Sequence, residues 1–188
     1  MDWSSIECVE GPNLTLRLIK PNDAAYVHGL RTNPLYNSHL SKVTGTVQDQ
    51  RAWIEGYKSR EAAGQDFYYV IERKDHTRCG LVRLYDFDVE SFTWGSWILD
   101  ESKPRKAALE SAVLIYQIGF LDHNFKSAIF KVLNENSHTL AFHRRFGALE
   151  TGHDELNTYF EYARARFEKD KMAHFSILES KNRDIRSN

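Results

Sequence analysis

The stretch 94–147 constrains the fold of this chain more than any other part of the sequence. Residues 91–99, which lead into it, are aromatic and β-branched around an interior glycine, a pattern typical of a strand with a bulge or a close backbone approach. Residues 106–120 are apolar on almost every side, which indicates a helix buried against a sheet. Residues 127–133 predict a second strand, and a short helix is expected to follow up to Arg145.

The ends of these two helices carry polar signals. Residues 134–137 offer helix-capping side chains, and Gly147 stands where a left-handed residue would end the second helix. At the start of the first helix, free N–H groups and the helix dipole favour an anion. Lys103, Arg105 and Lys106 add positive charge there, so a phosphate is the expected guest. An ordinary solvated basic turn stays open as the alternative, because the glycines of a typical phosphate loop are missing.

Composition excludes several classes of protein. The chain has 188 residues, enough for one domain with a sizeable core, and its 25 basic and 26 acidic residues give no case for nucleic acid or an anionic membrane. No apolar run approaches the ~20 residues of a membrane span, and no histidine spacing indicates a metal site. Cys8 and Cys79 match no metal or redox spacing, so two reduced thiols in a cytoplasmic protein are expected.

The other elements follow from alternation and from stop signals. Residues 156–167 predict a final strand, and 168–178 fit either extended chain or a short helix. Thr46 and Asp49 have the spacing of a capping box at the start of a helix. The long polar segment 31–46 is expected to be a ligand-facing loop. Further strands are predicted at 13–19, 67–73 and 78–85, and a helix at 24–30.

Two motifs in this order resemble the GNAT acyltransferase superfamily. Residues 16–24, Leu-Arg-Leu-Ile-Lys-Pro-Asn-Asp-Ala, resemble its opening strand and helix start. Residues 132–148 resemble its closing motif, in which a strand ends at an asparagine and a helix runs into an aromatic–glycine pair. The resemblance implies a single α/β (α+β) domain over 13–178, with a mixed central sheet flanked by helices in the order βααβββαβαβ. A lead-in over 1–12 and a polar tail over 179–188 complete the chain.

Within the superfamily, the chain looks most similar to aminosugar N-acetyltransferases and ribosomal-protein N-terminal acetyltransferases. The resemblance implies that acetyl-CoA is the co-substrate and that an amine attacks the thioester directly in a ternary complex. The expected acceptor is a small-molecule amine, such as an aminosugar or a sugar nucleotide, or a protein N-terminus; a homodimer is left open. The alternative is a GNAT fold that has lost turnover and serves as a CoA-binding or regulatory module, which the glycine-free turn favours.

The resemblance also assigns roles to individual residues. His143 would protonate the leaving thiolate, a role that suits a near-neutral pKa, and Asn136 would hydrogen-bond the pantetheine arm. Gly95 is the expected point where the strands splay apart. Ala107 and Ala108 stand where the family has glycine, which alanine can replace only where φ is negative. The expected cofactor-binding residues are Trp97, Ile98, Leu99, Lys103, Arg105, Lys106, Ala107, Ala108 and Asn136.

The acceptor side is less defined. Tyr36 and His39 in the loop 31–46, and Tyr159 near the last strand, are the expected substrate-binding residues. An aminosugar nucleotide would also need an aromatic stacking partner and a partner for its phosphate. The candidates for that phosphate partner are Arg31, Arg51 and Arg83. The general base is left open among Glu72, Asp86, Asp88, Glu90, Asp100 and Glu101.

Overall fold

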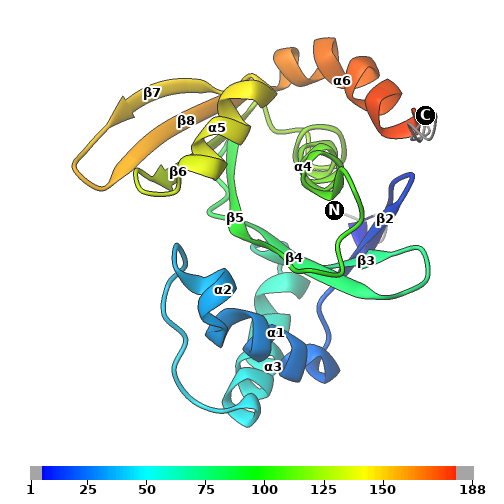
Figure 1. Cartoon of the computed structure of the whole chain (residues 1–188), viewed down its shortest axis with the longest axis vertical. Coiled ribbons are helices and arrows are strands. Elements are labelled where there is room, and N and C mark those ends of the chain that lie inside the picture. Colours follow the sequence, from blue (N-terminus) through cyan, green and yellow to red (C-terminus); the bar gives the residue numbers. More distant parts are fainter. Residues whose placement is uncertain (1–5, 181–188) are drawn as a thin grey trace, which may run out of the picture.

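A computed structural model describes residues 6–180, and its centre is one eight-stranded sheet (Figure 1). The strands lie in the order β1-β2-β3-β4-β5-β6-β8-β7. Every neighbouring pair is antiparallel except β5 and β6, which run parallel. The strands are β1 (Cys8–Glu10), β2 (Leu14–Leu18), β3 (Phe67–Arg73), β4 (Arg78–Tyr85), β5 (Ser91–Leu99), β6 (Ser127–Leu133), β7 (Leu149–His153) and β8 (Asn157–Ala163).

Helices cover both faces of the sheet and enclose two hydrophobic cores. Figure 1 shows α1, α2 and α3 on one side and α4 and α6 on the other. Ile54 and Tyr57 of α3 pack in the smaller core with Val27 of α1, whereas α4 lies in the larger core. The helices are α1 (Ala24–Thr32), α2 (Pro34–Asn37), α3 (Val47–Ala62), α4 (Ala107–Gln117), α5 (Ser137–Phe146) and α6 (Arg164–Glu179). This is the mixed, helix-flanked single-domain fold that the sequence predicts.

Local signals decide where several elements begin and end. Thr46 and Asp49 form the predicted capping box: the Asp49 amide donates to Thr46 Oγ1 at 3.2 Å, and the Thr46 amide donates to Asp49 Oδ2 at 2.7 Å. Gly147 ends α5 with φ at 98°, in the left-handed region that glycine adopts most readily. The strands β3, β4 and β6 have the predicted bounds.

The predicted strand over 156–167 is wrong beyond Ala163, because Arg164 begins helix α6. The cause is tertiary packing: the ring of Phe167 contacts Tyr116 and Phe120 on the α4 side, and the helix buries Phe167 and Leu178. Residues 168–178 therefore belong to a helix. Cys8–Glu10 form an edge strand inside the expected lead-in. Most of the expected tail, 181–188, lies outside the described residues.

Two further departures lie in the connecting segments. The short helix α2 falls inside the predicted loop 31–46, and the apolar helix ends at Gln117 and continues as one π-helical turn to Asp122. Both cysteines are free thiols, Cys8 exposed and Cys79 buried. Within the described residues, no helix has both the length and the apolar character needed to cross a bilayer.

Candidate active site

The central strands β5 and β6 are paired at one end only. Ser91 and Phe92 pair with Ser127 and Ala128, and the pairing between these two strands ends there. Beyond that point β5 pairs only with β4, and β6 only with β8. The sheet therefore opens into a wedge between the carboxyl ends of two parallel strands, a position where α/β sheets commonly bind ligands.

A bulge in β5 marks the open part of the strand. Arg83 of β4 pairs with Gly95, but Leu81 pairs with Ile98, so β5 has one extra residue over this interval. Ser96 adopts a left-handed φ of 47°, an uncommon conformation for a residue other than glycine. The bulge against β4 thus lies next to the Gly95 expected from the sequence, whereas the splay from β6 already begins after Phe92.

Backbone groups of β5 line the wedge. The amide of Asp100 donates to the carbonyl of Cys79 on β4 at 3.0 Å. Because backbone groups alternate in direction along a strand, those of Leu99 and Trp97 turn toward the wedge, and those of Ile98 turn toward β4. Of the three strand residues expected to contact a cofactor, Trp97 and Leu99 therefore present polar backbone there, whereas Ile98 is buried in the smaller core.

The basic turn after β5 leads into a helix start that can bind an anion, although it lacks the glycines that such turns usually contain. Lys106 precedes α4 with φ at 69°, so a lysine holds the left-handed position. Ala107 and Ala108 lie in α4 with helical backbone, which is the condition under which alanine can replace glycine. In such a helix start the N–H groups of Ala108 and Leu109 have no intrahelical acceptor and point out of the helix end.

The three basic side chains of this turn have different surroundings. Lys106 does not point at the helix start: its Nζ donates to the carbonyl of Ile177, and to the carbonyl and hydroxyl of Ser180 at 3.1 and 3.0 Å. It ties the end of α6 to the turn. Lys103 and Arg105 are exposed, and Lys103 Nζ lies 3.3 Å from the carbonyl of Asp100. Lys103 and Arg105 are thus the exposed basic side chains of this turn, and their contact with an anion stays a prediction.

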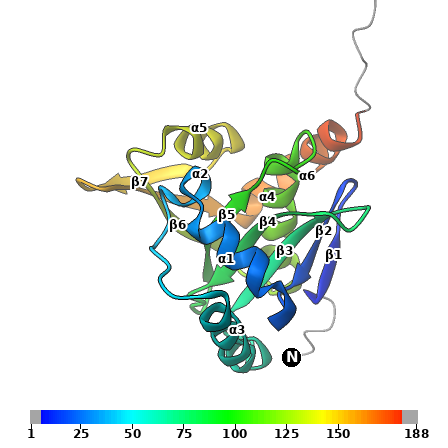
Figure 2. The same ribbon diagram turned by 60° about the horizontal axis from the view of Figure 1, so that its bottom comes forward.

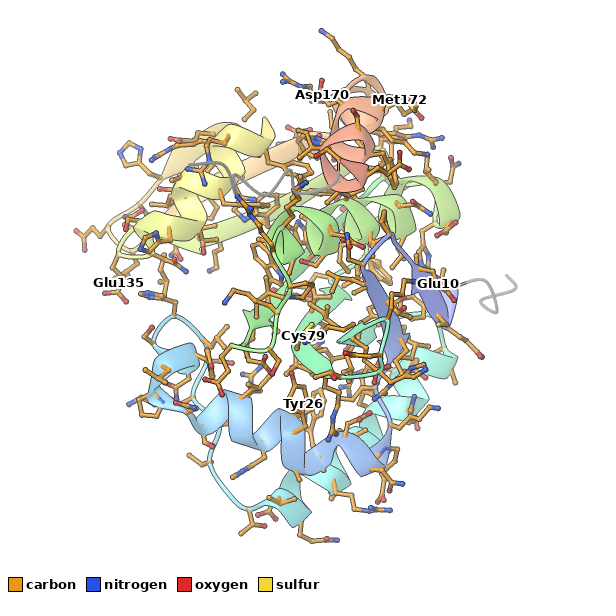
Figure 3. The ribbon with its side chains drawn as sticks, turned by 45° about the vertical axis from the view of Figure 1, so that its right-hand side comes forward. Glu10, Tyr26, Cys79, Glu135, Asp170 and Met172 are labelled. Carbon is orange, nitrogen blue, oxygen red and sulfur yellow. The ribbon has the colours of Figure 1, made fainter. Side chains whose placement is uncertain are left out.

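A buried carboxylate holds the turn in place. Asp100 is 7% exposed and accepts hydrogen bonds from the hydroxyl of Tyr26 at 2.7 Å and from the amide of Ser102 at 2.8 Å. Figure 3 labels Tyr26 between α1 and this turn. The contact joins the helix layer below the sheet to the turn above it.

Asn136 caps α5 at the β6 side of the wedge. Its Oδ1 accepts the amide of Thr139 at 3.2 Å. The cap uses the carbonyl oxygen of the side chain, so the amide nitrogen of Asn136 stays compatible with a hydrogen bond to a ligand. The structural role predicted for Asn136 is confirmed, and its contact with pantetheine stays a prediction.

His143 does not have the near-neutral pKa expected of it. The side chain is 3% exposed and packs among the rings of Trp94, Phe130 and Phe160, with centroids 5.4, 4.4 and 5.7 Å away. Burial lowers its pKa to about 3, so the imidazole is neutral at physiological pH. The expected role as acid for the thiolate depends on a near-neutral pKa, which burial does not leave to this side chain.

On the α3 side, a cleft of about 480 Å³ begins at the β5 bulge. Ser96 lines one end, Tyr68 and Arg83 line the part that faces β3 and β4, and Trp53 and the loop after α2 close the rest. Figure 2 shows α3 and this loop on the same side of the sheet. The charged residues that line it are Arg31, Lys42, Arg83 and Asp49. We call this the acceptor cleft. Positive charge predominates in this lining, because three basic side chains face one carboxylate.

The three acceptor residues predicted from sequence do not line the acceptor cleft. Tyr36 is half-buried in α2 against the smaller core. His39 Nδ1 lies 3.4 Å from Glu135 Oε1, which joins the loop to the residue before Asn136; Figure 3 labels Glu135. Tyr159 lies on β8, with its hydroxyl 2.6 Å from Asp154. Their roles in substrate binding stay predictions.

The sequence named three arginines as possible phosphate partners but could not tell which of them line a cleft. Arg31 and Arg83 line the acceptor cleft, whereas Arg51 pairs with Glu55 at 3.1 Å and does not. Trp53 and Tyr68 were missed, because a tryptophan in an amphipathic helix and a tyrosine in a buried strand are typical core residues. Only the fold shows that Trp53 stays 40% exposed at a cleft.

The candidate bases are dispersed. Glu72 is engaged by Arg17 Nη2 at 2.8 Å, and Asp86, Asp88 and Glu90 belong to the β4–β5 connection, at the end of β5 opposite the wedge. None of the six candidates lines the acceptor cleft. A carboxylate outside the cleft could accept the proton of the amine only through a chain of water molecules.

A splayed pair of parallel strands, a basic helix start beside it and a cleft that meets the strand bulge define an acyl-CoA-dependent transferase. A family model described as the acetyltransferase (GNAT) domain matches residues 13–149. The chain belongs to this family of N-acetyltransferases, which use acetyl-CoA. In this chain the wedge, Lys103, Arg105 and the start of α4 fit that co-substrate.

Relatives agree with the assignment. The chain is 22% identical over 144 residues to an uncharacterized N-acetyltransferase, YokL, derived from the SPbeta prophage of Bacillus subtilis (strain 168), covering 76% of this chain and 79% of that protein. The apo structure of FdhC, described as a nucleotide-linked sugar GNAT, is 38% identical with a TM-score of 0.83, over 89% of this chain and 97% of that one.

A more distant structure shares the fold alone. Spermidine N-acetyltransferase from Vibrio cholerae, solved with CoA and spermine, is 17% identical with a TM-score of 0.74, over 84% of this chain and 99% of that one.

Arg105→Ala is expected to weaken binding of desulfo-CoA about tenfold, equal to about 1.4 kcal/mol, by removing a charge from the anion site. Isothermal titration measures this, with Arg51→Ala as the matched control because that arginine lies on α3, away from the turn. If the Arg105→Ala and wild-type proteins bind desulfo-CoA with equal affinity, the diphosphate of this ligand binds away from the turn.

Proposed function

We propose that this N-acetyltransferase transfers the acetyl group of acetyl-CoA to the amino group of a nucleotide-linked aminosugar. The observation that carries the proposal is the charge of the acceptor cleft, whose lining has Arg31, Lys42 and Arg83 against Asp49. Asp66, which pairs with Arg83 from outside this lining, is shared with Arg60, so the excess of positive charge remains. A polycationic amine would be repelled by such a lining, whereas the diphosphate of a nucleotide sugar would be attracted. The description of FdhC as a nucleotide-linked sugar GNAT supports the same acceptor class.

Trp53 is the proposed stacking partner of this acceptor. Its ring is 40% exposed and is held by a parallel stack on Tyr57, with centroids 5.6 Å apart. A flat, pre-positioned ring suits a nucleobase or the apolar face of a sugar. The proposed reaction places the amine near the β5 bulge, because Ser96 of β5 lines the cleft.

In this reaction the amine nitrogen attacks the thioester carbonyl directly, forming the amide bond as the carbon–sulfur bond breaks. The proton lost by the amine balances the one gained by the thiolate, so a water relay can complete the transfer without a net acid or base. Backbone groups of Trp97 and Leu99 face the wedge and are proposed to orient the thioester arm, together with Asn136.

An acceptor panel tests the proposal. With acetyl-CoA, we expect kcat/KM for an amino-sugar nucleotide to exceed that for spermidine or for a peptide N-terminus by at least 100-fold, measured by release of the CoA thiol. Trp53→Ala should raise KM for the nucleotide sugar about tenfold with little change in kcat, and Trp53→Phe should keep most of the affinity. Faster turnover of spermidine or the peptide would refute the acceptor class.

A further inference from the structure

Two buried hydrogen-bond donors of the acceptor cleft have no acceptor among residues 6–180. They are the hydroxyl of Tyr68 and the Nε of Arg31. Tyr68 is only 2% exposed, yet it lines the cleft. Buried polar groups are nearly always satisfied, so two unsatisfied ones facing the same cleft call for a ligand that supplies the missing acceptors.

The arginines around this hydroxyl are already oriented by the protein. Arg31 Nη2 donates to the carbonyl and hydroxyl of Ser41 at 3.0 and 2.8 Å. Arg83 donates through Nε to Asp66 at 2.7 Å, and also through Nη2, which fixes the plane of its guanidinium. Asp66 is shared with Arg60 at 3.3 Å. The guanidinium groups of Arg60 and Arg83 therefore share one carboxylate. Together with Arg31, the cluster keeps a net positive charge.

The Tyr68 hydroxyl is a hydrogen-bond donor at any physiological pH. Burial raises its pKa, and the charge of Arg31, a hydrogen bond that the hydroxyl accepts from Arg31 and the charge of Arg83 oppose this without cancelling it. The hydroxyl therefore keeps its proton. A ligand that satisfies a phenol O–H and two guanidinium groups together has to present several oxygen acceptors with negative charge, as a phosphate does.

We propose that Tyr68, Arg31 and Arg83 form a phosphate subsite in the acceptor cleft, which holds the diphosphate of the nucleotide-linked acceptor. This inference rests on the proposed function. Arg83 pairs with Gly95 at the β5 bulge and its guanidinium lies 5.7 Å from the centre of the Trp53 ring, so a phosphate bound there would fix where the sugar amine lies relative to the bulge. Tyr68 is a specificity-determining residue in this assignment, because a neutral or cationic acceptor leaves its hydroxyl unsatisfied.

Tyr68→Phe tests the subsite, since it removes one oxygen and keeps the buried ring. Titration of UDP and dTDP into protein saturated with desulfo-CoA, which fills the cofactor site first, is expected to show about tenfold weaker binding in the variant. The thermal midpoint should change little, because the hydroxyl proton has no acceptor in the protein without ligand. The affinity for desulfo-CoA should not change.

Tyr69→Phe is the matched control. Tyr69 is the next residue of β3, fully buried and also without an acceptor for its hydroxyl among the described residues, but it packs in the larger core on the opposite face. Its variant should bind both diphosphates like the wild type. Unchanged affinity in Tyr68→Phe, or an equal loss in Tyr69→Phe, would overturn the subsite.

Further probes separate this inference from the proposed function. Inorganic pyrophosphate and an aminosugar 1-phosphate should bind at least tenfold more weakly than UDP or dTDP; equal affinity would overturn the assignment to a nucleotide. If a phosphate-free aminosugar is acetylated as efficiently as its nucleotide-linked form, the subsite fails and the acetyltransferase assignment stands. If spermidine is preferred, the proposed acceptor class itself fails.

Discussion

Glu110→Ala is expected to lower the free energy of unfolding by about 3–4 kcal/mol. Glu110 is fully buried in α4, and its carboxylate accepts three hydrogen bonds from the start of β2. Oε1 accepts the amides of Asn13 at 2.6 Å and Leu14 at 2.8 Å, and Oε2 accepts the Asn13 side-chain amide at 2.9 Å. Alanine would leave the buried amide of Leu14 without an acceptor and remove the partner of both Asn13 donors. Urea unfolding followed by circular dichroism measures the loss.

Two variants separate the causes of this effect. Glu110→Gln keeps an acceptor oxygen but removes the charge, so it should lose about 1–2 kcal/mol. Glu101→Ala removes an exposed carboxylate just before the same helix and should change stability by less than about 0.5 kcal/mol. Wild-type stability in Glu110→Ala would show that the carboxylate does not hold α4 against β2.

The second large effect is a loss of stability in acid caused by His143. Its pKa is about 3 in the folded protein and 6.5 without the surrounding structure. Below pH 6.5 the unfolded chain binds a proton that the native state excludes, so stability decreases as pH falls. The decrease approaches about 1.4 kcal/mol per pH unit and reaches about 2 kcal/mol at pH 5. It is complete only near pH 3.

His143→Leu isolates this contribution. The free energy of unfolding is measured for the wild type and the variant between pH 7.5 and 5. Over this range the wild type should lose about 2 kcal/mol more than the variant loses. Burial also lowers the pKa of His123, to about 4, so both proteins keep some acid sensitivity. Parallel stability curves for the two proteins would mean that His143 is solvated and titrates normally, which would restore it as a candidate acid.

The sequence predicted most of the fold, because its strongest signals are local. β-Branched runs bounded by turn residues gave β3, β4 and β6, and side-chain caps placed the starts of α3 and α5. The ordered motifs identified the family, which the comparisons confirm. The basic turn before α4 was also found from sequence, since charge next to a helix start is a pattern of neighbouring residues.

The tertiary structure decided what depends on burial and on residues far apart in the chain. Contact with α4 made 164–179 a helix, and an aromatic cage made His143 neutral. The sequence could not separate Arg31 and Arg83 from Arg51, because their difference lies in which face of the sheet and which helix they meet. Local patterns set secondary structure, whereas desolvation and pairing, which only the folded chain defines, set the chemistry of its side chains.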